Sequence, residues 1–187
     1  MIFSRKSFIL VFFSLLLIVP ALAGCSANQD PTKKQIQAID AIRTRLDLPK
    51  LPLTFVELTT MLNSPSGNLL VNNYQDSAGR KYFVNPETNL VVEIDARAVL
   101  SNLPSGAASL SEENITALAQ KYISATIPNF KAQQAKWSYE TGNKGDNYFF
   151  SWYDDNNPTA FNRPFVQVGL QKSGVLFAYY NTLLLEK

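Results

Sequence analysis

Apolar residues recur at helical spacing in two segments of the chain, and each segment precedes a series of strand-like runs. In the first segment, four apolar residues lie three or four positions apart and share one helix face: Ile36, Ile39, Ile42 and Leu46. Asp30 and Pro31 are typical of a helix start, since the carboxylate caps free amides and proline fits the first turn. The pattern ends before Pro49.

The second helical pattern follows Ser111, which is a favourable residue for capping a helix start. Glu112 and Glu113 would occupy the first turn, where acidic side chains suit the helix dipole. The apolar stripe comprises Ile115, Leu118, Ala119, Tyr122 and Ile123, and it ends before Pro128. The sequence therefore predicts a second helix between Ser111 and Pro128.

Strand-like runs separated by turn sequences follow each helix. After the first helix they span residues 69–75, 80–84 and 89–95, while the segment TFVELTTML from Thr54 fits either a strand or a short helix. Within 89–95, Leu90, Val92 and Ile94 alternate with their neighbours, as in a strand with one buried face. After the second helix the predicted strands span residues 134–140, 147–154, 164–171 and 174–182.

The two halves of the chain share a weak internal repeat. Tyr74-Gln75-Asp76 aligns with Tyr153-Asp154-Asp155, and Arg80 aligns with Arg163. We therefore predict an α+β fold of two tandem units, each a helix packed on a small antiparallel β-sheet. The units would span residues 34–100 and 107–187, joined by a stretch of small residues.

The N-terminal segment is typical of a secretory signal peptide, with Arg5 and Lys6, an apolar middle and small residues at its end. Leu22-Ala23-Gly24-Cys25 closely resembles the lipobox of bacterial lipoproteins. This resemblance implies that residues 1–24 are removed and that Cys25 carries a diacylglyceryl group. Residues 25–33 would then be a lipidated tether. An uncleaved membrane anchor and a buried, inert cysteine are the alternatives.

Composition restricts the possible chemistry. The chain has no histidine and one cysteine, which excludes Ser-His-Asp triads, Cys-His pairs and an internal disulfide. Without Arg5 and Lys6 the basic residues equal the 15 acidic ones in number, and there is no basic run or glycine-rich phosphate loop. We therefore expect no nucleic-acid partner, no cofactor and no metal, and we do not expect an enzyme.

Pairs of acidic residues are the remaining candidates for chemistry. Glu112 and Glu113 are explained by helix capping, and Glu93 and Asp95 are predicted on the outward face of their strand. Asp154-Asp155 precedes NNPTAFN, a loop that offers oxygen ligands for calcium, but it lacks the regular spacing of a calcium loop. ETGNKGDN is similarly imperfect, and solvated hairpin loops are the preferred interpretation of both segments.

Most aromatic residues of the chain follow Tyr122, and one strand carries them on both faces. The core face of that strand is predicted to hold its bulkier residues, Tyr148, Phe150 and Trp152. Phe149 and Tyr153 lie on the other face, which either packs on the first unit or forms a recognition surface. Phe149 and Tyr153 are therefore the candidate residues for contact with a partner.

The second unit is similar to PepSY-type domains. These begin with a capped helix of the form Ser-x-Glu-x-x-x-x-x-Ala and end in two strands joined at a glycine, here Ser111, Glu113, Ala119 and Gly174. The first unit resembles them less, with Asn89 at the glycine position. The resemblance implies a non-catalytic extracytoplasmic module, of a kind found in peptidase propeptides and proposed to modulate peptidases.

These observations predict a lipid-anchored PepSY-like binding module on the extracytoplasmic face of a membrane in the cell envelope. Its expected partner is a protein or peptide, and a peptidase is one candidate. A solute- or calcium-binding envelope lipoprotein and a carboxylate-dependent envelope enzyme are the alternatives.

Overall fold

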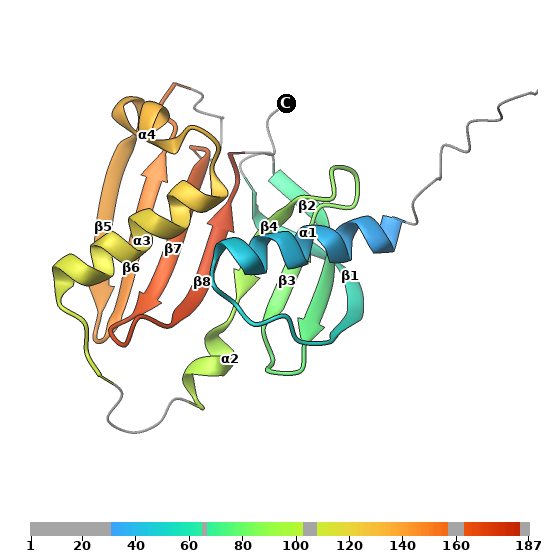
Figure 1. The fold of residues 1–187 in the computed structure, drawn as a ribbon. Helices are drawn as coiled ribbons and strands as arrows, with labels where there is room; N and C mark the ends of the chain where they lie inside the picture. The colour runs from blue at the N-terminus through green and yellow to red at the C-terminus, as the bar shows by residue number, and fades with distance from the viewer. Residues whose placement is uncertain (1–30, 65–66, 103–107, 157–162, 184–187) are drawn as a thin grey trace, which may run out of the picture.

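The computed structural model describes residues 31–64, 67–102, 108–156 and 163–183. The predicted signal peptide and the predicted lipid site Cys25 lie outside these residues. The described part has an α+β fold with one antiparallel sheet of eight strands, in the order β1-β2-β3-β4-β8-β7-β6-β5 (Figure 1). The predicted α+β class is confirmed.

Each half of the chain supplies a long helix followed by four strands. The first half contains α1 (Pro31–Arg45), β1 (Leu53–Ser64), β2 (Gly67–Asp76), β3 (Lys81–Val84), β4 (Val91–Asp95) and the short α2 (Arg97–Leu100). The second half contains α3 (Glu112–Thr126), α4 (Phe130–Gln133), the 3-10 turn η1 (Gln134–Lys136), β5 (Ser138–Lys144), β6 (Asn147–Tyr153), β7 (Phe165–Gln171) and β8 (Leu176–Asn181).

The strands form one continuous sheet, whereas we predicted a separate small sheet under each helix. The two halves join where β4 pairs with β8, through Glu93 with Tyr180, Ile94 with Tyr179 and Asp95 with Ala178. An unpaired last strand in each half would expose a row of free backbone donors and acceptors. Pairing β4 with β8 satisfies these groups and extends the sheet across both halves.

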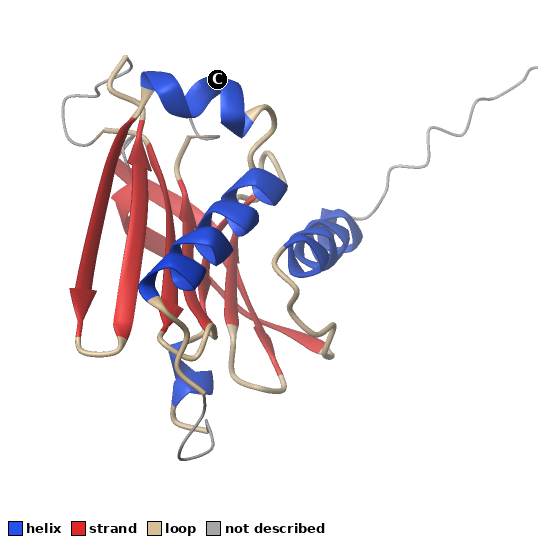
Figure 2. Cartoon of the chain, turned by 60° about the vertical axis from the view of Figure 1, so that its left-hand side comes forward, coloured by secondary structure: helices blue, strands red, loops and turns tan. Residues whose placement is uncertain are grey.

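Both long helices lie on the same face of the sheet (Figures 1 and 2). Ile39 of α1, Leu46 directly after that helix, and Ile115 and Ile123 of α3 are fully buried. They belong to a single core with the covered side of the strands. The start of α3 is as predicted, since the Ser111 side chain accepts a hydrogen bond from the backbone amide of Asn114. The apolar stripes therefore determine which sheet face is covered.

The structure resolves one ambiguous prediction and corrects another. The segment after Thr54, predicted as a strand or a short helix, is strand β1, and the strand predicted over 134–140 begins only at Ser138. The residues before Ser138 form short helical turns because Asn129 adopts a left-handed backbone and Phe130 is buried against the ring of Trp152. Burial of the Phe130 ring thus favours helical turns where the start of a strand was predicted.

Candidate functional site

The sheet face opposite α1 and α3 is the candidate site, and we call it the open face. Two adjoining hollows lie on it. The aromatic hollow, of about 320 Å³, is lined by Met61, Arg97, Phe149, Tyr153, Phe165, Gln167, Phe177, Ala178 and Tyr180. The acidic hollow, of about 300 Å³, is lined by Thr59, Thr60, Met61, Val71, Phe83, Glu93 and Tyr180. Met61 and Tyr180 belong to both hollows, so the hollows are neighbours.

A β-bulge in β8 places an aromatic ring in the aromatic hollow. Gly169 of β7 pairs with Ala178, and the next register pair is Leu170 with Leu176, so Phe177 is the extra residue. A Cβ atom on Gly169 would lie 2.8 Å from the Phe177 ring. The glycine therefore leaves the space that the Phe177 ring occupies.

The aromatic rings of the open face contact one another in two groups. The rings of Phe149 and Phe177 are perpendicular, with their centroids 5.2 Å apart. Phe165 lies between Tyr153 and Tyr180, with centroid distances of 5.7 and 6.5 Å. Pairs of this kind add to the stability that burial of the rings provides. The rings therefore form a preorganised apolar surface.

The structure brings the two predicted candidates together. Phe149 and Tyr153 both line the aromatic hollow. Phe150 and Trp152 point to the helix-covered core, where they are 2% and 3% exposed, so the predicted assignment of the two strand faces is confirmed. Phe177 was not predicted on this face, because a bulge changes the face of a residue without leaving a pattern in the sequence.

A second bulge, in β4, forms the acidic hollow. Phe83 pairs with Glu93 and Val84 with Val91, which leaves Val92 as the extra residue. Val91 joins the core under the helices, whereas Val92 is fully buried with an apolar cluster on the open face. The predicted simple alternation in this strand is therefore wrong at both Val91 and Val92. Glu93 lies beside Phe83 and Tyr180.

The two acidic residues of β4 have different surroundings. Burial raises the pKa of the Glu93 carboxyl, although a hydrogen bond with Tyr180 opposes this shift. Hydrogen bonds from Arg97 lower the pKa of Asp95, with distances of 2.9 Å from Nε to Oδ1 and 2.7 Å from Nη2 to Oδ2. Burial, together with the nearby Glu93, raises the pKa of Tyr180 to about 12. Arg97 thus forms its ion pair with Asp95.

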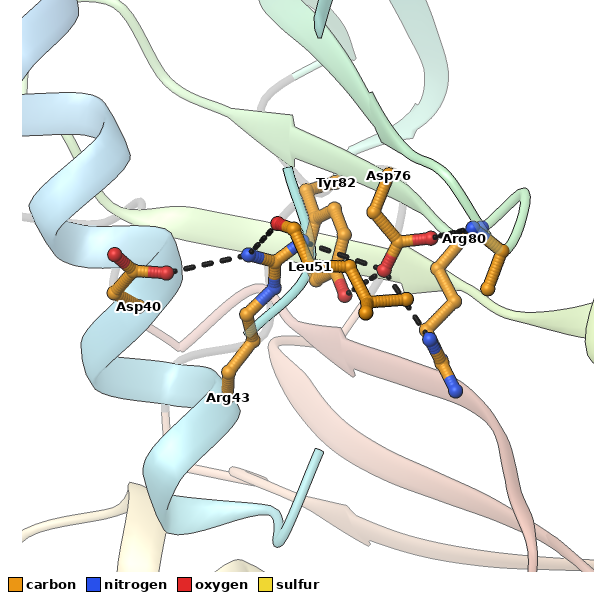
Figure 3. Close-up of polar contacts among 7 residues, drawn as sticks. Asp40, Arg43, Leu51, Asp76, Arg80 and Tyr82 are labelled. Carbon is orange, nitrogen blue, oxygen red and sulfur yellow. Dashed lines mark hydrogen bonds and ion pairs between the residues drawn. The ribbon is translucent and has the colours of Figure 1, made fainter. Parts of the chain in front are cut away.

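A buried ionic cluster centred on Asp76 lies between α1 and the helix-covered face of the sheet (Figure 3). The fully buried Asp76 carboxylate accepts hydrogen bonds from Arg43 Nη2 at 3.3 Å, Arg80 Nη1 at 3.2 Å and the Tyr82 hydroxyl at 3.0 Å. The backbone amides of Ala78 and Arg80 also donate to it, each at 3.0 Å. We call these residues the Asp76 cluster.

Arg43 links this cluster to α1. Its guanidinium also donates to Asp40 Oδ1 at 3.2 Å and to the carbonyl oxygen of Leu51 at 2.9 Å, and it lies over the ring of Tyr82 (Figure 3). Burial raises the pKa of Tyr82 to about 12, so its hydroxyl remains a donor to Asp76. Because the carboxylate is buried and saturated with donors, the cluster fixes α1 to the sheet and is not available to a ligand.

The predicted acidic loop after β6 is held by an exposed ion-pair network. Arg163 donates to Asp155 Oδ1 at 2.9 Å and to Glu140 Oε1 at 3.0 Å. Residues 157–162 of this loop lie outside the described residues. Within the described ranges, no three side chains of the histidine, cysteine, aspartate and glutamate types gather as a metal site would require.

No helix within the described residues is long and apolar enough to cross a membrane. Comparison with protein-family models, curated proteins and solved structures gave no match to this chain.

Proposed function

We propose that this protein is a lipid-anchored binding module of the cell envelope, with two tandem PepSY-like units and an open face that contacts a protein or peptide partner. The aromatic hollow carries this proposal. Concave apolar surfaces with a few polar groups at their rim are typical of binding sites, and aromatic residues are enriched where binding energy concentrates. Phe149 and Tyr153 are the proposed contact residues, and no residue is assigned a catalytic role.

Features that recur in both halves support the tandem interpretation. Asn89 and Gly174 precede the last strand of their halves, and both have a positive φ, of 57° and 85° respectively. Asp76 forms an ion pair with Arg80 at the end of β2, and Asp155 forms one with Arg163 after β6. The two ion pairs lie at positions that the sequence repeat matches, whereas Asn89 and Gly174 correspond through the resemblance to PepSY-type domains.

The cysteine-containing N-terminal segment supports the proposed location. Lipidation of Cys25 would place the first described residue, Pro31, within about 20 Å of the lipid, because an extended chain spans at most roughly 3.5 Å per residue. A peptide or protein at the membrane surface would therefore lie within reach of the open face. Two or more acyl chains would retain the module there durably.

Site-specific photo-cross-linking in the native envelope tests the proposal. A benzoylphenylalanine at position 149 should give a discrete cross-linked product, whereas the same group at the exposed Gln120 of α3 should not. Tyr153→Ala should reduce the product from position 149 by at least about tenfold, the effect of truncating a binding hot spot. Equal cross-linking from positions 149 and 120 would refute the assignment of the open face.

A further inference from the structure

The acidic hollow contains the carboxylate of Glu93, which forms no salt bridge with any of the described residues. Glu93 is half-buried, and the wall around it includes Val71, Met61 and Phe83. Val71 is fully buried and Met61 is 8% exposed, so much of this wall is shielded from water. A carboxylate in such surroundings loses part of its hydration, and a nearby cation would compensate for that loss.

The nearby charge of Arg97 opposes the raised pKa of Glu93, but Arg97 forms its ion pair with Asp95. Arg97 is engaged in two hydrogen bonds with Asp95. Within the described residues, no lysine or arginine nitrogen forms a salt bridge with Glu93. The Tyr180 hydroxyl provides one hydrogen bond. Because an ionised carboxylate offers about four acceptor positions, Glu93 retains capacity for further donors.

We propose that the acidic hollow binds a lysine or arginine side chain of the partner, an inference that rests on the proposed binding role of the open face. The aliphatic part of such a side chain would pack on Met61 and Phe83, and its charged end would pair with Glu93. Long basic side chains commonly combine an apolar stem with a charged tip in this way. The hollow, of about 300 Å³, has the size of a small ligand pocket.

The neighbouring aromatic hollow extends this specificity. It shares Met61 and Tyr180 with the acidic hollow and is lined by the rings of Phe149 and Phe177. An apolar side chain is the chemical match for these rings, because burying it there removes apolar surface from water. The preferred partner segment therefore carries a basic residue close to an apolar one.

A divalent metal ion fits the acidic hollow less well than an organic cation. Calcium takes six to eight oxygen ligands, and Glu93 is the only carboxylate among the described residues that line this hollow. The rings of Phe83 and Tyr180 instead suit an ammonium or guanidinium group, which is attracted to aromatic faces. Calcium binding is thus an alternative outcome of the test.

Met61 provides a specific reporter for the experiment. The chain has two methionines, Met1 and Met61, and only Met61 lines the two hollows. The full lipidated chain, labelled with ¹³C-methyl methionine and placed in lipid nanodiscs, would be titrated with n-butylguanidinium chloride, which mimics an arginine side chain. Met61→Leu identifies the reporter resonance.

We expect a saturable shift of the Met61 methyl resonance with n-butylguanidinium and none with 1-butanol at equal concentration. Glu93→Gln should weaken binding by about tenfold or more, as expected for the loss of a partly buried charge pair. The matched control is Glu87→Gln, an exposed turn residue, which should bind like the parent. Glu93→Asp keeps the charge and should retain most of the affinity for n-butylguanidinium. This variant therefore separates the contribution of the charge to binding from that of side-chain packing.

An absent shift, an equal response to 1-butanol, undiminished binding by Glu93→Gln, or a saturable response to calcium chloride instead would each overturn the inference. The cross-linking experiment separates this failure from failure of the proposed function. If Tyr153→Ala abolishes the cross-link from position 149 while Glu93→Gln leaves it intact, the open face binds its partner without a basic side chain in the acidic hollow. Loss of the cross-link in both variants agrees with both proposals.

Discussion

Replacement of Asp76 by alanine tests whether the Asp76 cluster stabilises the fold. The change removes a carboxylate that accepts five hydrogen bonds and leaves the Arg43 guanidinium, which is 1% exposed, without its main counter-charge. Arg80, with a side chain 10% exposed, also loses its ion-pair partner. A buried charge without a partner is the main cost of such a change.

Removing one partner of a buried ion pair typically lowers the free energy of unfolding by about 3–5 kcal/mol. Arg43 keeps Asp40 and the Leu51 carbonyl as acceptors, so we expect the lower half of that range, about 3–4 kcal/mol. For a protein of this length the corresponding fall in the melting temperature is roughly 10 °C. Such a loss is a large fraction of the stability of an ordinary domain.

The second half of the chain provides a matched control. Asp155 is the residue that the sequence repeat pairs with Asp76, and its ion pair with Arg163 is exposed, with side-chain exposures of 43% and 42%. Solvent screens an exposed pair strongly, so Asp155→Ala should leave the unfolding midpoint unchanged within error. Urea unfolding followed by far-UV circular dichroism measures both variants against the parent.

Equal stability of Asp76→Ala and Asp155→Ala would refute this reasoning. It would mean that solvation or rearrangement of Arg43 compensates for the lost carboxylate. Arg43→Met tests whether the unpaired charge of Arg43 causes the loss of stability, because this change removes the buried cation and keeps most of the apolar stem. If burial of the unpaired charge dominates, Asp76→Ala combined with Arg43→Met should be more stable than Asp76→Ala alone.

Four further changes probe the two sheet faces and the anchor. Trp152→Ala should lower the free energy of unfolding by about 3–5 kcal/mol, whereas the half-buried Phe149 should cost less when truncated; a Trp152→Ala protein as stable as the parent in urea would show that the faces are reversed. Because burial raises the pKa of Glu93, the folded protein binds the proton of this carboxyl more tightly than the unfolded chain does. The contribution of this proton to the free energy of unfolding is therefore present at low pH and is lost as pH rises through the folded pKa. Urea unfolding at pH 4 and pH 8 should therefore show Glu93→Gln gaining stability relative to the parent at the higher pH, and a difference independent of pH would contradict this. Cys25→Ser should abolish incorporation of a labelled fatty acid, and continued labelling of the variant would disprove lipidation at Cys25.

Local patterns predicted the helices and most strands because each depends on interactions within a few residues. The stripe of α3 and the cap at Ser111 are examples. The union of two sheets into one depends on the pairing of Asp95 with Ala178, which are far apart in the chain. Backbone hydrogen bonding between strands leaves little trace in residue types, so this pairing is not readable from one sequence.

The candidate site was predictable only in part for a similar reason. Alternation placed Phe149 and Tyr153 on the uncovered face, but the bulges at Val92 and Phe177 interrupt alternation in the two strands that meet at the centre of the sheet. Arg43 was missed because its charge suggests an exposed position. Arg43 lies four residues after Ile39 and three before Leu46, and both of these residues are fully buried. This helical spacing is the signal that identifies Arg43 as a buried residue.

The position of β8 has a consequence for the order of events during biogenesis. This strand comes last along the chain among the described strands, yet it lies between β4 and β7 in the middle of the sheet. A chain that emerges N-terminus first exposes the edge of β4 until residues 176–181 arrive, and contacts between such distant segments form slowly. A chain truncated before β8 would retain two open edges, on β4 and β7, and would be prone to edge-to-edge association. The two halves of the described sheet can therefore pair only after synthesis has passed β8.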